Sequence, residues 1–276
     1  MKRWMVATTV ATCVLNTLRT GQKVCAAFVV MSCVIPIFAQ SVHTYSISSY
    51  GVTGGTLTVS EDTAADGTIT RTVRIKSHAW ASVFYDVDTM LQCVQEHTPT
   101  GTVHTVTKKV AEKDFSQNDI LCLCFKSSGD VPVAVKKSWG HWTDVQGGTS
   151  TVFNVESGAL DMVCFFFNLR HHILEKTDTE DDHLIMDGAS HAVSITVGKP
   201  TTKKTDYGKI EVVPVNIVSK SPTLFVRNKP KNILVSKHTP TVLSVDIGYS
   251  VGTARATLSS WTTNDIPVNL KSAFAP

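Results

Sequence analysis

SGALDMVCFFFNLRHHIL, residues 157–174, is the stretch that decides the fold. At helical spacing one face of it carries Leu160, Val163, Cys164, Phe167, His171 and Leu174. Much of the remaining circumference carries Met162, Phe165, Phe166, Leu169 and Ile173. A helix that is apolar on almost every side is buried, and about eleven apolar residues are too few to cross a bilayer. The sequence therefore predicts one buried helix, for which Ser157 is the expected N-cap.

The sequence on both sides of this helix is typical of antiparallel β-structure. Residues 68–76 alternate, with Ile69, Val73 and Ile75 on one face, and the preceding Asp66-Gly67 favours a hairpin. Residues 79–96 and 102–112 are expected to be strands joined by a turn at Thr98-Pro99-Thr100-Gly101. Strands rich in Thr and Val continue to residue 261. The prediction is a mostly β fold, a curved antiparallel sheet or incomplete β-barrel wrapped around the helix at about 157–174.

The first 39 residues are expected to be a signal or targeting segment, followed by a single β-rich domain over residues 40–276. The uncharged run VCAAFVVMSCVIPIFA, residues 24–39, follows Arg19 and Lys23 and precedes a polar sequence. A basic flank, a short apolar core and a small residue before a polar start are typical of a secretory signal. The run is shorter than the roughly 20 residues that a membrane span requires. We expect export to the periplasm or cell envelope, with cleavage after Ala39.

Two other interpretations of this segment stay open. Cys33, preceded by Val30 and Ser32, resembles a loose lipoprotein cleavage box, which would attach a lipid to Cys33. An uncleaved segment would instead serve as an anchor. Either outcome would associate the protein with a membrane, including the outer membrane.

The charge of the chain argues against a nucleic-acid partner. The net charge is +3, but four of the 26 Lys and Arg residues lie within residues 1–39, which contain no acid. The other 22 bases face 23 acidic residues. Binding to nucleic acid depends on clustered positive charge, which the near-neutral body lacks.

Three segments resemble a bacterial domain-of-unknown-function family, 3108. They are Val155-Glu156-Ser157-Gly158-Ala159-Leu160 running into Phe166-Phe167-Asn168-Leu169-Arg170, FYDVDTMLQCV at 84–94, and Ile233-Leu234-Val235-Ser236 with VGTARATL at 251–258. The resemblance spans roughly residues 45–262, and the chain departs from it at Lys237-His238-Thr239-Pro240. It implies an exported, envelope-facing β-protein without known catalysis. By analogy it also implies a half-barrel related to folds that carry lipids and lipoproteins.

No pattern in the sequence predicts an enzyme, a metal site or a cofactor. His171, His172 and His183, with Asp181 and Asp182, form a metal-like group. Adjacent histidines on a helix point about 100° apart and rarely share one ion, so this acidic stretch is expected to be a solvated loop. The glycine-rich GVTGG at 51–55 lacks the lysine and helix of a phosphate loop, and there is no nucleophile elbow.

The cysteines beyond the leader are expected to be free thiols that pack as small apolar side chains. They are Cys93, Cys122, Cys124 and Cys164. Export permits disulfides, but a bridge between Cys122 and Cys124 would strain an extended strand.

Two functional hypotheses follow. In the first, a non-catalytic envelope protein holds a lipid, an acylated envelope component or another apolar ligand between sheet and helix. Phe165, Phe166 and Phe167 would lie at the mouth of the site, and Trp80 could line it. In the second, the protein is a structural or assembly factor of the envelope with a filled core. An exported hydrolase ranks last.

Overall fold

A computed structural model of the 276-residue chain describes most of residues 39–274. The described ranges are 39–83, 86–112, 115–126, 133–139, 148–156, 158–175, 180–186, 188–221, 229–239, 241–249 and 252–274. The predictions for the leader, Cys33 included, fall outside them, apart from Ala39 at the start of the first strand. No helix among the described residues combines the length and the apolar character that crossing a bilayer requires.

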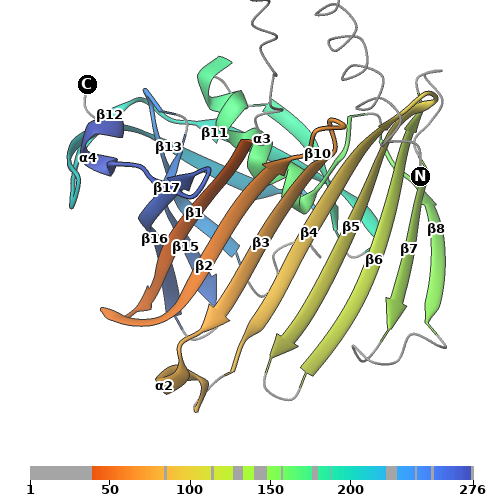
Figure 1. Cartoon of the computed structure of the whole chain (residues 1–276), viewed down its shortest axis with the longest axis horizontal. Helices are drawn as coiled ribbons and strands as arrows, with labels where there is room; N and C mark the ends of the chain where they lie inside the picture. Colours follow the sequence, from red (N-terminus) through yellow and green to blue (C-terminus); the bar gives the residue numbers. More distant parts are fainter. Residues whose placement is uncertain are drawn as a thin grey trace, which may run out of the picture. The chain divides into compact units, whose positions relative to one another are not determined.

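The first half of the domain is a series of strands, each antiparallel to the next, with one short helix. The elements are β1 (Ala39–Ser49), β2 (Val52–Thr63), β3 (Ile69–Ser77), α2 (Ala79–Ser82), β4 (Asp88–Thr98), β5 (Gly101–Glu112), β6 (Phe115–Lys126), β7 (Val133–Trp139) and β8 (Thr149–Asn154). Figure 1 shows these strands side by side in chain order, from β1 to β8.

The second half contains the long helix and a second group of strands. The elements are β9 (Leu160–Asp161), α3 (Met162–Glu175), β10 (Glu180–Met186), β11 (Ala189–Val197), β12 (Thr201–Thr205), β13 (Gly208–Ser219), β14 (Lys229–Ser236), β15 (Val242–Tyr249), β16 (Gly252–Thr263), β17 (Ile266–Pro267) and α4 (Leu270–Ala273).

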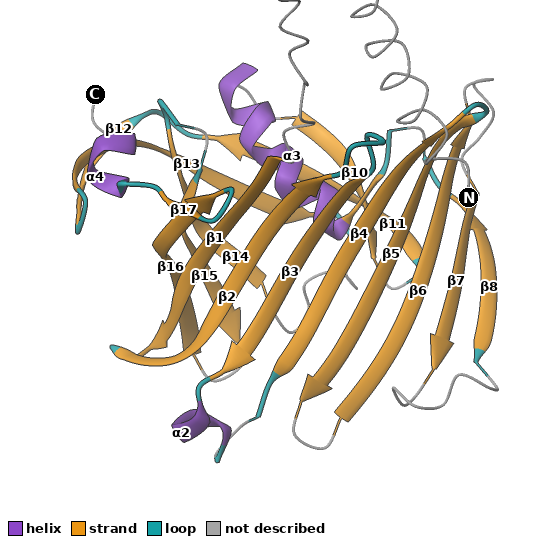
Figure 2. Cartoon of the chain, viewed as in Figure 1, coloured by secondary structure: helices purple, strands orange, loops and turns teal. Residues whose placement is uncertain are grey.

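One pairing joins the two halves into a single sheet. β16 runs antiparallel to β1, on the edge of β1 opposite to β2. From β16 the sheet continues through β15, β14 and β13 to β11, β10 and the short parallel strand β9. Among the described strands the sheet is open and not closed into a barrel, and α3 lies between its two halves (Figure 2). The predicted curved sheet around one apolar helix is therefore confirmed.

Two predicted turns are confirmed. In the β2–β3 hairpin Gly67 has a φ of 84°, and the Thr68 N–H donates to the Asp66 carboxylate over 3.0 Å. The β4–β5 hairpin pairs Thr98 with Gly101, as the Pro-Thr turn between them predicts.

Three sequence-based expectations need correction. The strand expected from residue 79 begins only at Asp88, because residues 79–82 form α2, where the Ser82 hydroxyl bonds the carbonyl of His78. The long helix begins at Met162 rather than just after Ser157, because residues 160–161 pair with β10 as β9. Asp181, Asp182 and His183, which were expected to lie in a solvated loop, belong instead to β10, which starts at Glu180.

Candidate functional site

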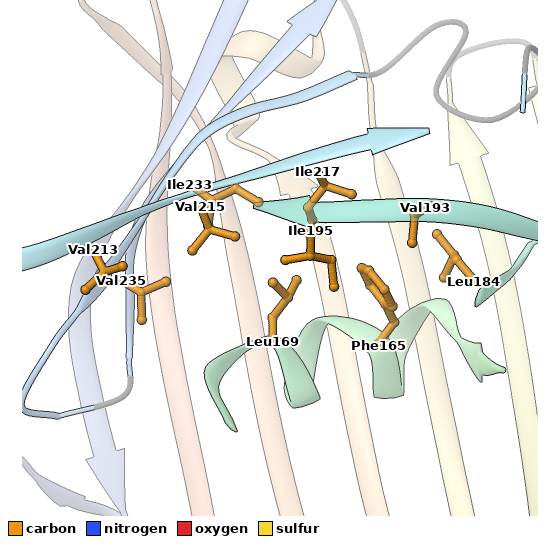
Figure 3. Close-up of a cluster of buried hydrophobic side chains, with 10 residues drawn as sticks. All are labelled: Phe165, Leu169, Leu184, Val193, Ile195, Val213, Val215, Ile217, Ile233 and Val235. Carbon is orange, nitrogen blue, oxygen red and sulfur yellow. The ribbon is translucent and has the colours of Figure 1, made fainter. Parts of the chain in front are cut away.

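The helix α3 is covered by sheet on two sides. Phe165 and Leu169 pack on the second group of strands, in a cluster of buried side chains from β10, β11, β13 and β14. Figure 3 shows this cluster, with the side chains of Phe165 and Leu169 pointing from the helix toward Ile195 and its neighbours. On the other side, Val163 and Phe167 pack against β4 and β5. Because two walls cover it, the helix is apolar around most of its circumference.

Three of the four residues predicted to bind an apolar ligand lie on α3, but they do not form one site. Phe165 and Phe167 are buried, at 1% and 6% exposure, and Phe166 is half-buried with its ring edge-on to Phe165 at 5.6 Å. Trp80 belongs to α2, is 52% exposed and lies next to Gly54. Phe165 and Phe167 face opposite walls, so the three phenylalanines do not line one surface.

A group of polar side chains lies at the beginning of α3, on the wall formed by β4 and β5. It consists of Cys93, His104, Asp161 and Cys164, called here the Cys₂HisAsp cluster. One potential ligand atom of each residue lies within 4.8 Å of the others, and all four residues are buried. No pattern in the sequence pointed to this group.

The contacts within the Cys₂HisAsp cluster are short. The two sulfur atoms are 3.5 Å apart, and the Cys93 sulfur is 3.5 Å from Oδ2 of Asp161. The same Oδ2 is 3.3 Å from Nδ1 of His104, which lies 3.8 Å from the Cys164 sulfur. Every member therefore contacts at least two others.

Strand register and helix geometry place these side chains. Cys93 on β4 pairs with Val106 on β5, so His104, two residues from Val106, is a diagonal neighbour of Cys93 on the same face. Asp161 precedes α3, and its Oδ1 accepts the N–H groups of Val163 and Cys164 at 2.9 and 3.0 Å. Asp161 thus caps the helix, the role expected for Ser157, and this cap turns its Oδ2 toward His104.

Proximity shifts the pKa values in this group. Burial disfavours the charged form of His104, but hydrogen bonds with Asp161 and Cys164 outweigh it and raise the pKa of His104 to about 9. The hydrogen bond with Cys93 lowers the pKa of Cys164 to about 6, against burial. The same bond, together with burial, raises the pKa of Cys93. Burial would raise the pKa of Asp161, yet its bonds to His104 and to the backbone of Cys164 hold that pKa below its usual range.

Arg71 on β3 is the nearest basic side chain to these sulfur atoms among the contacts of the described residues. Its Nη1 lies 3.4 Å from the Cys164 sulfur and 3.1 Å from the Gln95 side-chain oxygen. Its Nε donates to Glu61 over 2.7 Å, and its guanidinium lies 5.5 Å from the centre of the Phe167 ring. Arg71 pairs directly with Cys93 in the β3–β4 register, which places it on the same wall.

This arrangement suits ion binding better than nucleophilic catalysis. A thiolate beside an imidazole resembles the pair of a cysteine hydrolase. However, Cys93 and Cys164 are each only 1% exposed, so the surrounding strands keep a substrate away from both sulfur atoms. Two thiols, an imidazole and a carboxylate are also a set of zinc ligands.

The metal-like residues that sequence analysis set aside do not gather in the described part of the chain. Asp181 pairs with Lys220 at 2.5 Å and accepts from Ser194 at 2.9 Å, on an exposed part of β10. The side chains of His171 and His172 lie outside the described residues. All four cysteines of the described residues are free thiols. The expectation that they pack as small apolar side chains is wrong for Cys124 on β6, which is exposed, and for Cys93 and Cys164, which are buried but have polar contacts.

Comparison with known proteins identifies the fold alone. No protein family and no curated protein matches the sequence. The chain is similar in structure to a beta-barrel-like protein of domain-of-unknown-function family DUF1849 from Brucella abortus, with a TM-score of 0.54. The sequences are 10% identical, and the match covers 83% of this chain and 98% of the other. The neighbour belongs to DUF1849, whereas the sequence resemblance was to family 3108.

Proposed function

We propose that this protein is a non-catalytic, exported component of the bacterial cell envelope that acts as a structural or assembly factor. The observation that carries the proposal is the burial of α3 between two walls of the sheet. Phe165 and Leu169 pack on one wall and Phe167 on the other. Apolar side chains that are already in contact with protein on both sides gain little from a ligand. This favours the filled-core hypothesis over the ligand-holding one.

A second candidate function is the binding of an acyl chain, and Phe166 is the observation that favours it. Its side chain is half-buried, although its two neighbours in the sequence are buried. An acyl chain that covered this ring would gain roughly 0.8 kcal/mol for each methylene removed from water.

Titration with a fluorescent fatty acid separates the two functions. The filled-core protein is expected to show no saturable binding. Saturable binding that Phe166→Ser weakens, while Phe115→Ser on the exposed start of β6 does not, would refute the structural function and establish the second one. Circular dichroism of both variants must first show that they are folded, because loss of the fold would also abolish binding.

Export is tested separately, by sequencing the N-terminus of the protein isolated from its own cells. A signal segment is expected to leave Gln40 or a nearby residue as the first one. An acylated Cys33 at the N-terminus would instead establish lipid attachment. A cytosolic protein that begins at Met1 would contradict export.

A further inference from the structure

The Cys₂HisAsp cluster lies where four elements meet: β4 and β5 of one wall, the short strand β9, and the beginning of α3. We propose that this cluster binds one Zn²⁺ ion in a closed, structural site. The ligands are the sulfur atoms of both cysteines, Nδ1 of His104 and Oδ2 of Asp161.

Four of the six distances between the ligand atoms can be compared directly with tetrahedral zinc. Bonds of about 2.3 Å to sulfur and about 2.0 Å to nitrogen or oxygen place two sulfur ligands about 3.8 Å apart. The same geometry separates sulfur from nitrogen or oxygen by about 3.5 Å, and nitrogen from oxygen by about 3.3 Å. The observed distances are 3.5 Å between the sulfur atoms, 3.5 and 3.8 Å from sulfur to oxygen and nitrogen, and 3.3 Å between nitrogen and oxygen. These four distances lie within about 0.3 Å of the tetrahedral values. The other two pairs, Cys93 with His104 and Cys164 with Asp161, lie within 4.8 Å, so binding of the ion would draw the four ligand atoms together.

The chemistry of the ligands selects zinc among common divalent ions. Calcium and magnesium prefer oxygen ligands, whereas two thiolates with an imidazole suit a borderline-soft ion in a tetrahedral site. Four protein ligands complete the coordination of zinc and leave no position for a substrate. The burial of all four residues fits a structural role rather than a catalytic one.

Neighbouring groups orient and balance the ligands. Two backbone N–H groups hold Oδ1 of Asp161, which leaves its Oδ2 for the ion. The rings of Phe125 and His104 pack in an edge-to-face manner, with their centres 5.0 Å apart. Zinc with two thiolates and one carboxylate carries one net negative charge, and Arg71, 3.4 Å from the Cys164 sulfur, supplies a positive charge beside it.

An ion at this position would join parts of the chain that are far apart in the sequence. Asp161 and Cys164 stand 57 and 71 positions after His104 and Cys93, respectively. Zinc would therefore hold the beginning of α3 against β4 and β5, and its binding free energy would add to the free energy of folding.

The first test measures metal content in the full-length chain, purified with reductant and without chelator. Roughly one zinc ion per chain is expected in the wild type. Replacing both sulfur ligands, with Cys93→Ser and Cys164→Ser, is expected to abolish binding. The matched control carries Cys122→Ser and Cys124→Ser on β6, which removes the same number of thiols away from the cluster, and it is expected to retain the ion.

A second measurement does not depend on the folding of any variant. X-ray absorption at the zinc edge of the wild type should give two sulfur atoms at about 2.3 Å and two nitrogen or oxygen atoms at about 2.0 Å. A shell of nitrogen and oxygen alone would overturn the proposal. So would a reduced wild type that takes up no added zinc, or an equal loss of zinc in the control. If the reduced wild type takes up no zinc, a Cys93–Cys164 disulfide found in protein purified without reductant would identify the cluster as a redox-active thiol pair instead.

Discussion

Replacing Phe165 by alanine tests the packing of α3 directly. The ring is 1% exposed and lies in a cluster with Leu184, Val193 and Ile195. Removing a fully buried phenylalanine ring costs about 3–5 kcal/mol, because apolar contacts are lost and a cavity remains. Domains have a total stability of only about 5–15 kcal/mol, so this variant loses a large part of it.

Urea denaturation followed by circular dichroism measures the effect. The midpoint of unfolding should fall by an amount equivalent to about 3–5 kcal/mol, and the melting temperature by roughly 6–20 °C for a domain of this size. Phe115→Ala is the matched control, since the same atoms are removed from a side chain that is 55% exposed. Its stability should change by no more than about 0.5 kcal/mol.

A loss below about 1 kcal/mol in Phe165→Ala would refute the reasoning. Such a value would mean that the ring does not fill the space between α3 and the strands shown in Figure 3. A loss of the same size in both variants would equally contradict the assigned burial.

Two further predictions concern the sheet. Asp246 accepts two hydrogen bonds from Arg255, at 2.6 and 3.0 Å, which with Asn232 hold its pKa below the usual range despite burial. Because the Arg255 side chain is 61% exposed, Asp246→Asn should lower the free energy of unfolding by only about 1 kcal/mol at pH 7. A carboxylate whose pKa is lowered by folding stabilises the folded state above its unfolded pKa of about 3.9, and this stabilisation is lost as the pH falls through the folded pKa. The free energies of unfolding of wild type and variant, measured by urea denaturation, should therefore converge below about pH 4. A difference in stability that is unchanged at low pH would contradict the pairing. In Gly198→Ala, the new Cβ would meet the Pro214 ring at 2.7 Å and its carbonyl oxygen at 3.2 Å, so a loss of about 1–3 kcal/mol is expected in the same assay. Gly54→Ala, whose nearest contact is 3.6 Å, is the control, and equal losses would count against the predicted clash.

The fold could be predicted because local patterns agree with it. Alternation along residues 68–76 and the turns at Asp66-Gly67 and Thr98–Gly101 specify hairpins, and the helix that is apolar all round requires a surrounding sheet. The beginning of the helix was misplaced because Leu160 and Asp161 pair with β10, a contact between segments that helical periodicity does not encode.

The Cys₂HisAsp cluster was missed for a related reason. The predicted turn between Thr98 and Gly101 already places Cys93 and His104 diagonally on one face of a hairpin. Which hairpin faces the beginning of α3 depends on long-range packing, so nothing local connects these residues with Asp161 and Cys164. The available signal was Arg71, a charged residue on the face of β3 that carries Ile69, Val73 and Ile75. A charged side chain on an otherwise apolar face is stable only with polar partners, and in the structure these partners are Glu61, Gln95 and Cys164.

The pairing of β1 with β16 also governs when the chain can finish folding. The backbone N–H of Asn264 donates to the Gln40 carbonyl, and the Gln40 N–H donates to the side-chain Oδ1 of Asn264, which stands 224 positions later in the chain. β1 can form its hairpin with β2 early, but its other edge has no strand to pair with until β16 has been synthesised. Contacts of such long range slow folding, because a large loop must close before they form. Until then the edge of β1 presents unpaired backbone groups, so the growing chain depends on its last strands for protection from aggregation.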